Sequence, residues 1–407
     1  MKTDEKNKIL FLSPFFFPEE ISTGKYNTTL VNALKSRGCE VSVIASQPLY
    51  PDWKPKKTNM SLQGVKVFRG GLFIRYTRFQ VLRRAILEIW YSYHVASKLV
   101  KYGKNYDMVI GVFPPVIYML VASIFLPKKI VKVGIVHDLQ GLMAKSNQNL
   151  KRIVVSKLIK FVEIIAFKKC DKLICLSDAM RSEIVNSYRM STSVTSVFYP
   201  FVSIEERENK TSGLKEIFSS EHTHVVYSGA LGEKQKPKEL LQFLVKLCEA
   251  KSSVICHVFS RGPVFEELSE SMASKDNNRI LFHDLVPEEL LVEMYERSTI
   301  HIIPQAEGTG AGAFPSKLPN LLSQGVPVFA ICDKNSELNN VLKRVDFTKV
   351  VCGWNEAEMV ESMLEFIDDV KGKARSGFRE NFNEKIGAMF DVDTLADDLA
   401  KILKNVS

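Results

Sequence analysis

Short apolar runs recur along this chain, and segments with helical periodicity separate them. In the first half the runs are Lys8–Ser13, Glu40–Ala45, Val65–Arg69, Asp107–Gly111, Ile130–Val136, Asp171–Cys175 and Val194–Phe198. In the second half they are Val225–Ser228, Val254–Ser260, Ile280–His283, Thr299–Ile303 and Val326–Ile331. Continuous apolar strands that alternate with helices are typical of parallel sheets covered by helices on both faces. The pattern therefore predicts an α/β protein.

The strand–helix series begins twice, which predicts two domains. The segment Tyr199-Pro200-Phe201 and the charged stretch Glu205–Lys215 separate the two series. A chain of 407 residues is long enough to give each domain its own core. We expect Rossmann-like domains at residues 1–200 and 201–385, with a C-terminal helix, residues 386–407, that packs back towards the first domain.

Sequence composition disfavours several classes of protein. The first loop has only Gly24 where a dinucleotide fold would carry GxGxxG, so a nicotinamide or flavin cofactor is disfavoured. Seven cysteines without a CxxC pair indicate free thiols in a reducing cytoplasm and no metal site. The polar start shows no signal peptide, and the longest apolar run, Val112–Leu126, is too short to span a membrane. We expect a cytoplasmic protein that uses no cofactor.

Charge is distributed unevenly along the chain. Residues 1–200 hold 31 Lys and Arg against 13 Asp and Glu, whereas the rest is acidic. Between Lys66 and Lys104 there are nine basic residues and a single acid, Glu88, interleaved with aromatic residues. This stretch, with a helix expected at about Phe79–Tyr102, suits the surface of an anionic membrane. A nucleic-acid site and an ordinary solvated helix are the alternatives, and no nucleic-acid motif accompanies the stretch.

The stretch Pro304–Ala330 has the features of a phosphate site. Small residues precede a short predicted helix. We expect Ser316 to be its N-cap, Lys317 its first helical residue and Pro319 its third. Gly325 should follow its last turn. Helix N-termini with small-residue loops bind anions. The alternative is an ordinary loop–helix junction.

Further candidate residues follow the ends of other strands. Lys234 and Arg261, together with Lys317, come just past strands of the second series, at the edge where parallel sheets bind nucleotides. His137, followed by Asp138, has the same position in the first series and could accept a proton, although a lone histidine is more often structural. Asp391-Val392-Asp393 resembles a metal-binding motif, but a helix cap is the simpler interpretation.

Five segments in order resemble the family 4 glycosyltransferases, most closely the bacterial colanic-acid-type fucosyltransferases. They are FLSPFFFPEEISTGKY, IVHDLQ, YSGALGEKQ, FHDLVPEELLVEMYERS and PSKLPNLLSQGVPV. The resemblance covers nearly the whole chain. It implies a GT-B fold, in which two Rossmann-like domains face each other across a cleft. It also implies metal-independent transfer of a sugar, with retained configuration, from a GDP- or UDP-sugar to a saccharide acceptor.

The resemblance also implies roles for individual residues. The catalytic set would be His137 beside the reacting sugar and Lys234 and Lys317 on the departing diphosphate. The donor would further contact Gly24, Gly229, Arg261, Leu285, Val286, Glu307, Ser316 and Asn320. Leu285 and Val286 would hold the base and Asn320 a ribose hydroxyl. For Gly24, a helix-initiating glycine is an equally good interpretation.

Three positions depart from the pattern of the broader family, and at one of them, Asn320 in place of a glutamate, the subgroup also has asparagine. Gly312 replaces a glutamate, for which Glu307 could substitute, and Ala230 replaces an arginine, for which Arg261 could substitute. We expect an enzyme on the inner face of the cytoplasmic membrane that extends a lipid-linked saccharide for capsule, O-antigen or exopolysaccharide. The alternative is a sugar-nucleotide epimerase, or a non-catalytic partner of another transferase, with the same fold. Nucleic acid is not an expected partner.

Overall fold

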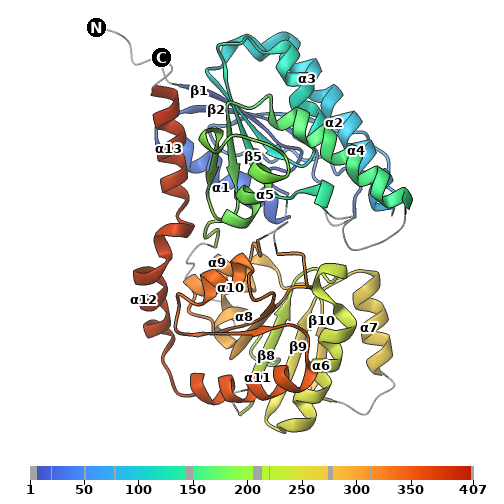
Figure 1. Cartoon of the computed structure of the whole chain (residues 1–407), viewed down its shortest axis with the longest axis vertical. Coiled ribbons are helices and arrows are strands. Elements are labelled where there is room, and N and C mark those ends of the chain that lie inside the picture. The colour runs from blue at the N-terminus through green and yellow to red at the C-terminus, as the bar shows by residue number, and fades with distance from the viewer. Residues whose placement is uncertain are drawn as a thin grey trace. The chain divides into compact units, whose positions relative to one another are not determined.

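The computed structural model describes residues 7–19, 21–49, 52–77, 79–142, 150–204, 213–219, 221–273, 278–310 and 314–404. The chain forms two compact units (Figure 1). The first contains Met1–Ser203 and Asp391–Ser407, and the second contains Ile204–Phe390. Each unit is a parallel sheet covered by helices, so the predicted α/β class is confirmed.

The first unit has a seven-stranded sheet with the order β3-β2-β1-β4-β5-β6-β7. Its strands are β1 Lys8–Leu12, β2 Glu40–Ser46, β3 Lys66–Gly70, β4 Met108–Phe113, β5 Val131–Val136, β6 Lys172–Cys175 and β7 Thr195–Val197. Its helices are α1 Ser22–Ser36, α2 Gln80–Tyr102, α3 Ile117–Phe125, α4 Leu150–Phe167, α5 Asp178–Asn186 and α13 Val392–Lys404. The strand order reverses between β1 and β4, and ligands bind α/β sheets at such a point.

The two faces of this sheet carry different helices. One face packs against α1 and α13, with Leu395 and Leu399 of α13 in the core. The other face packs against α2, α3, α4 and α5. Asp391 caps α13 by accepting hydrogen bonds from the N–H of Asp393 and from Thr394 Oγ1, so its predicted capping role is confirmed. Asp393 pairs at 2.9 Å with Arg37, the residue that follows α1, which ties the C-terminal helix to the first unit.

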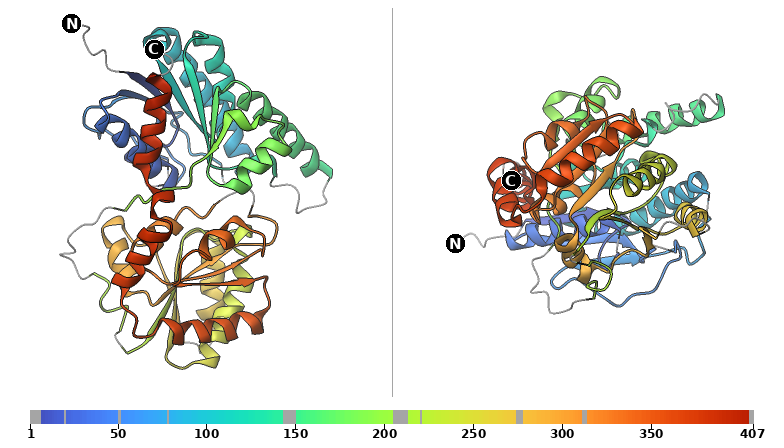
Figure 2. Two further views of the ribbon diagram at one scale, coloured as in Figure 1. Left: turned by 60° about the vertical axis from the view of Figure 1, so that its left-hand side comes forward. Right: turned by 90° about the horizontal axis from the view of Figure 1, so that it is seen from below.

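The second unit has a six-stranded sheet with the order β10-β9-β8-β11-β12-β13, and the order reverses between β8 and β11. Figure 2 shows this unit, coloured from yellow-green to red, in two further views. Its strands are β8 Thr223–Ser228, β9 Val254–Phe259, β10 Ile280–His283, β11 Ile300–Pro304, β12 Val328–Cys332 and β13 Thr348–Cys352. Its helices are α6 Pro237–Ala250, α7 Pro263–Ala273, α8 Leu291–Arg297, α9 Leu318–Ser323, α10 Glu337–Leu342, α11 Glu356–Val370 and α12 Arg375–Lys385. Its core includes α6 and α11 on one face.

The start of α9 differs from the sequence prediction. The helix begins at Leu318, so Lys317 and not Ser316 occupies the N-cap position, and Lys317 makes no side-chain cap bond. Pro319 is consequently the second helical residue, where its missing N–H costs nothing. Gly325 follows the helix with φ of +64°, as predicted, because this left-handed conformation favours glycine. Gly312 lies outside the described residues.

No helix within the described ranges combines the length and the apolarity needed to cross a bilayer.

Candidate functional site

Lys317 lies at the reversal point of the second sheet. Its ammonium donates a hydrogen bond to the carbonyl of Ser228, the last residue of β8, and stands 4.5 Å from the centre of the Tyr227 ring. Burial lowers the pKa of this ammonium to about 7. Within the described ranges no carboxylate pairs with this ammonium, and a partly buried cation of this kind gains most when an anion binds beside it.

Gly229, the residue after β8, lies beside the Lys317 ammonium and leaves the backbone there uncovered because it has no side chain. Gly229 has φ of +139°, a conformation that side chains rarely adopt. A Cβ on Gly229 would stand 3.4 Å from Lys317 Nζ, in the space beside the ammonium. An anionic group can therefore approach both the ammonium and the backbone at this position.

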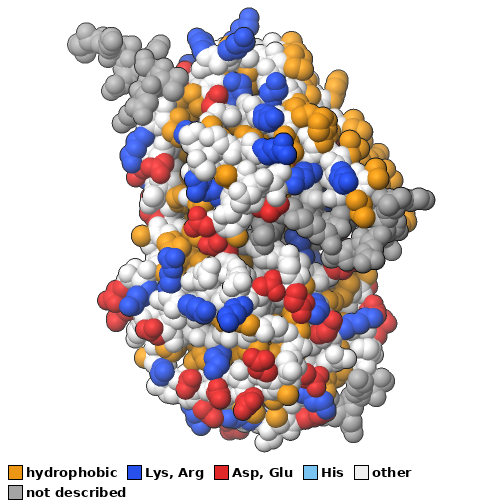
Figure 3. All heavy atoms as spheres, viewed as in Figure 1, with side chains coloured by type: hydrophobic (Ala, Val, Ile, Leu, Met, Phe, Trp, Pro, Cys, Tyr) orange, Lys and Arg blue, Asp and Glu red, His pale blue; other side chains and the backbone are white. Residues whose placement is uncertain are grey.

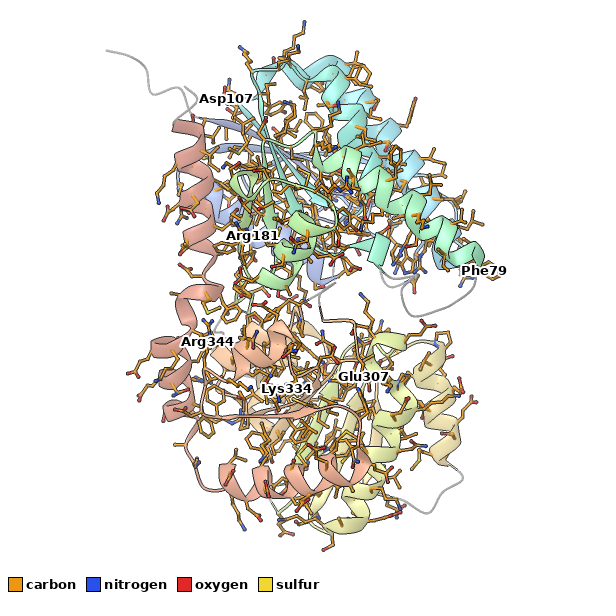
Figure 4. All side chains as sticks on the ribbon, in the orientation of Figure 1. Phe79, Asp107, Arg181, Glu307, Lys334 and Arg344 are labelled. Atoms are coloured by element: carbon orange, nitrogen blue, oxygen red, sulfur yellow. The ribbon has the colours of Figure 1, made fainter. Side chains whose placement is uncertain are left out.

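Lys234 and Glu307 lie in the loops after β8 and β11, and these loops are joined. The N–H of Ala306 donates to the carbonyl of Lys234 at 2.8 Å. The Glu307 carboxylate, in the loop after β11 (Figure 4), pairs with Lys236 at 3.0 Å. Gly229 and Lys317 thus lie together at the end of β8, Lys234 follows in the loop after that strand, and Glu307 binds the neighbouring Lys236.

The other donor-site candidates follow adjacent strands. Arg261 is exposed at the connection from β9 to α7. Leu285 and Val286 are half-buried just after β10, and Ser316 and Asn320 flank the start of α9. All of them lie towards the carboxyl edge of the second sheet, which is the arrangement that the strand pattern predicted.

His137 and Gly24 belong to the first unit. His137 follows β5 and lines a small apolar pocket with Tyr26, Asn27 and Phe201. Burial lowers its pKa to about 4, so the imidazole is neutral at pH 7 and able to accept a hydrogen bond. A Cβ on Gly24 would stand 2.8 Å from the carbonyl oxygen of Glu19, so close packing explains this glycine without a ligand.

Sequence reasoning missed a chain of three hydrogen-bonded histidines in the second sheet. His224 Nδ1 lies 2.8 Å from His257 Nε2, and His257 Nδ1 lies 3.1 Å from His283 Nε2. His224 Nε2 faces the carbonyl of Ser219, which can only accept, so each ring must donate through Nε2 and accept through Nδ1. Only the register of three strands brings these residues together.

We expect these three hydrogen-bonded histidines to make the folded protein less stable in acid. Burial, aided by the two neighbouring imidazoles, lowers the pKa of His257 to about 3. The folded state therefore disfavours the charged ring, and stability is lost as pH falls from about 6.5 towards 3. Between pH 7 and pH 5 we expect a loss of roughly 2 kcal/mol from this group. Denaturant unfolding of the wild type and of His257→Phe should show a smaller loss in the variant, and equal losses would contradict the assignment.

Comparisons with known proteins point to one family. The model described as Glycosyltransferase Family 4 matches residues 23–206, and the model described as Glycosyl transferases group 1 matches residues 215–385. A relative from Escherichia coli K12, WcaI, described as a colanic acid biosynthesis glycosyl transferase, is 20% identical over 377 residues. The alignment covers 88% of this chain and 90% of WcaI.

Solved structures share the fold. Sucrose-phosphate synthase from Thermosynechococcus elongatus superimposes with a TM-score of 0.76 at 14% identity, covering 98% of this chain and 99% of that one. WaaG, a glycosyltransferase involved in lipopolysaccharide biosynthesis, superimposes with a TM-score of 0.66 at 12% identity, covering 97% and 99%. The two parallel sheets of this chain therefore form the GT-B fold.

Proposed function

The chain is a family 4 glycosyltransferase, and we propose that it moves a sugar from a GDP- or UDP-sugar to a lipid-linked saccharide acceptor. The sugar would keep its anomeric configuration, and lysines rather than a metal ion would carry the charge of the diphosphate. WcaI is described as acting in colanic acid biosynthesis and WaaG in lipopolysaccharide biosynthesis. These similarities favour a role in a bacterial capsule, O-antigen or exopolysaccharide.

The observation that carries the donor proposal is the position of Lys317. Its ammonium lies beside Gly229 at the strand reversal, where the phosphates of a nucleotide would contact the backbone. When the sugar leaves, negative charge develops on the diphosphate, and a preorganised cation at that place lowers the barrier. Lys234 would share this role, and the neutral His137 would accept a hydrogen bond from the reacting sugar.

The acceptor proposal rests on a surface of the first unit, the α2–α4 face. Helix α3 packs against both α2 and α4. Large apolar side chains are exposed along these helices (Figure 3). They are Phe79, Val81, Leu82, Ile89, Tyr93, Val100, Ile124, Phe125, Val154, Val155, Leu158 and Phe161. Phe79, for example, is 77% exposed just before α2 (Figure 4).

The acids of this region are turned away from the α2–α4 face. Glu88 is the single acid of α2, and it accepts hydrogen bonds from the N–H groups of Val116 and Ile117. Glu163 is the single acid of α4, and it is buried. Both helices also carry lysines and arginines, and a surface of apolar and cationic side chains fits an anionic bilayer. We infer that the enzyme binds the inner face of the cytoplasmic membrane, where a lipid-linked acceptor would lie.

Thermal-shift measurements with GDP, UDP, ADP, CMP and their sugar conjugates test the donor proposal. A ligand at about a hundred times its dissociation constant stabilises the folded state by roughly 2.7 kcal/mol. We expect one nucleoside diphosphate to raise the melting temperature of the wild type and to raise that of Lys317→Ala less. A lack of any shift would favour a non-catalytic partner, in line with the uncharged Ala230. Conversion of a sugar nucleotide without an acceptor would favour an epimerase.

A further inference from the structure

Glu163 is a buried carboxylate that contacts the loop after His137. It lies on α4 and is 1% exposed. Its two oxygens accept hydrogen bonds from the N–H of Gln140 at 2.8 Å and from the N–H of Gly141 at 3.1 Å. The hydroxyl of Tyr188 donates a third bond at 2.7 Å. Three donors directed at one carboxylate hold it, and the loop, in a single arrangement.

The loop is fitted closely against α4 at the same place. A Cβ on Gly141 would stand 2.8 Å from a Glu163 oxygen and 2.8 Å from the Cβ of Lys160. Ser156, one turn before Lys160 on α4, donates a hydrogen bond from its hydroxyl to the carbonyl of Gly141 at 2.6 Å. The backbone of Gly141 is thus bound through both its N–H and its C=O. Without Glu163, two backbone N–H groups would lose their acceptor.

The bound loop starts from the candidate catalytic residue. His137 is anchored on one side, where its N–H donates to the carbonyl of Phe113 at 2.9 Å. Two residues further on, Leu139 is fully buried in the core, and the contacts of Gln140 and Gly141 with Glu163 follow at once. Only Asp138 and Leu139 separate His137 from Gln140, so a shift of the Gln140–Gly141 backbone would reach His137.

We propose that Glu163 is a positioning residue for sugar transfer, which holds the loop that follows His137 against α4. The proposal rests on the proposed function only through the role that this function gives to His137. Glu163 itself touches no substrate in this scheme. Its removal should impair turnover more than donor binding, because the candidate donor site lies in the second unit.

The charge state of Glu163 gives a specific readout. Burial raises its pKa to about 7, against the lowering effect of its three hydrogen bonds, and the carboxylate of Asp138 raises it further. Among the described residues, the other ionisable groups that face this position are Tyr188, Glu183 beside Tyr188, and Lys160, whose ammonium lies 4.8 Å from the centre of the Tyr188 ring. Only the carboxylate form can accept from all three donors. Turnover should therefore rise with pH through about 7.

The test compares Glu163→Ala and Glu163→Gln in the full-length protein with Glu40→Gln, a change of an exposed glutamate at the start of β2. We expect Glu163→Ala to lower kcat at least tenfold, to leave the Kd of the nucleoside diphosphate within twofold, and to speed amide exchange in residues 137–142. Glu163→Gln keeps one side-chain oxygen as an acceptor, so its kcat should lie between those of Glu163→Ala and the wild type. Because the amide does not titrate, turnover of this variant should not rise near pH 7. Glu40→Gln should match the wild type.

Several results would overturn the proposal. Unchanged exchange in residues 137–142, or an unchanged kcat in folded Glu163→Ala, would show that the contact does not position the loop. If Glu163→Ala fails to fold, a wild-type pH profile in Glu163→Gln would also show that the Glu163 carboxylate does not position the loop. A wild type that binds no nucleotide and transfers no sugar would refute the proposed function instead, whereas the exchange measurement would still decide whether Glu163 holds the loop.

Discussion

Replacement of Lys317 by alanine is expected to lower the rate of sugar transfer by about a hundredfold or more. The ammonium lies at the end of β8, where a Cβ on Gly229 would stand 3.4 Å from Lys317 Nζ. A cation aimed at developing charge lowers the barrier by on the order of 3 kcal/mol, because the partly buried site screens it less than water would. Steady-state kinetics with a purified lipid-linked acceptor would measure the loss.

The same lysine should make donor binding depend on pH. Its pKa of about 7 means that the ammonium loses its proton as the solution becomes alkaline. A bound diphosphate favours the charged form, so binding is coupled to proton uptake. The Kd of the nucleoside diphosphate should rise by up to about tenfold per pH unit above 7. Lys317→Ala should abolish this slope.

A matched control separates this role from general charge effects. Lys238 lies on α6, is 75% exposed, and pairs with Glu267 on the surface. Lys238→Ala removes the same charge from the same unit and should leave the rate unchanged. If Lys317→Ala folds and transfers sugar as fast as Lys238→Ala, the end of β8 is only a structural junction and the donor proposal fails.

Polar substitution on the α2–α4 face is expected to release the protein from anionic vesicles. Leu158 and Phe161 of α4 are 62% and 59% exposed. Insertion of each into the interface would contribute roughly 1.5 kcal/mol, so Leu158→Ser with Phe161→Ser should weaken partitioning by about a hundredfold. Sedimentation with vesicles of phosphatidylglycerol and phosphatidylethanolamine measures this, and added salt should weaken binding of the wild type.

Met60 offers the control for this experiment. It is 57% exposed in the first unit, between β2 and β3 and outside the α2–α4 face. Met60→Ser therefore removes a comparable apolar side chain and should not change vesicle binding. Equal binding by the double variant and the wild type would refute the membrane proposal. Soluble saccharide acceptors should still react with the double variant, because its site residues are intact.

Local patterns were enough to predict much of the fold. The apolar runs predicted the strands of both described sheets to within a few residues, because buried parallel strands must be apolar on both faces. The exception is β13, Thr348–Cys352, at the edge of the second sheet, which the pattern missed. The segment Asp391–Asp393 was correctly interpreted as a helix cap, which depends only on neighbouring residues. The position of Lys317 after a strand of the second series also followed from the order of elements, since parallel strands end at one edge.

The sequence by itself therefore determined the fold class, the two series of strands and the edges at which candidate residues gather. Tertiary structure alone decided which way individual side chains point. It directs Lys317 to the end of β8, turns Glu88 and Glu163 inward, and aligns three histidines on adjacent strands. It also places the first residue of α9 at Leu318, one residue later than the sequence pattern predicted. The physical reason is that strand register and helix rotation are set by packing between segments far apart in the chain, which local periodicity does not encode.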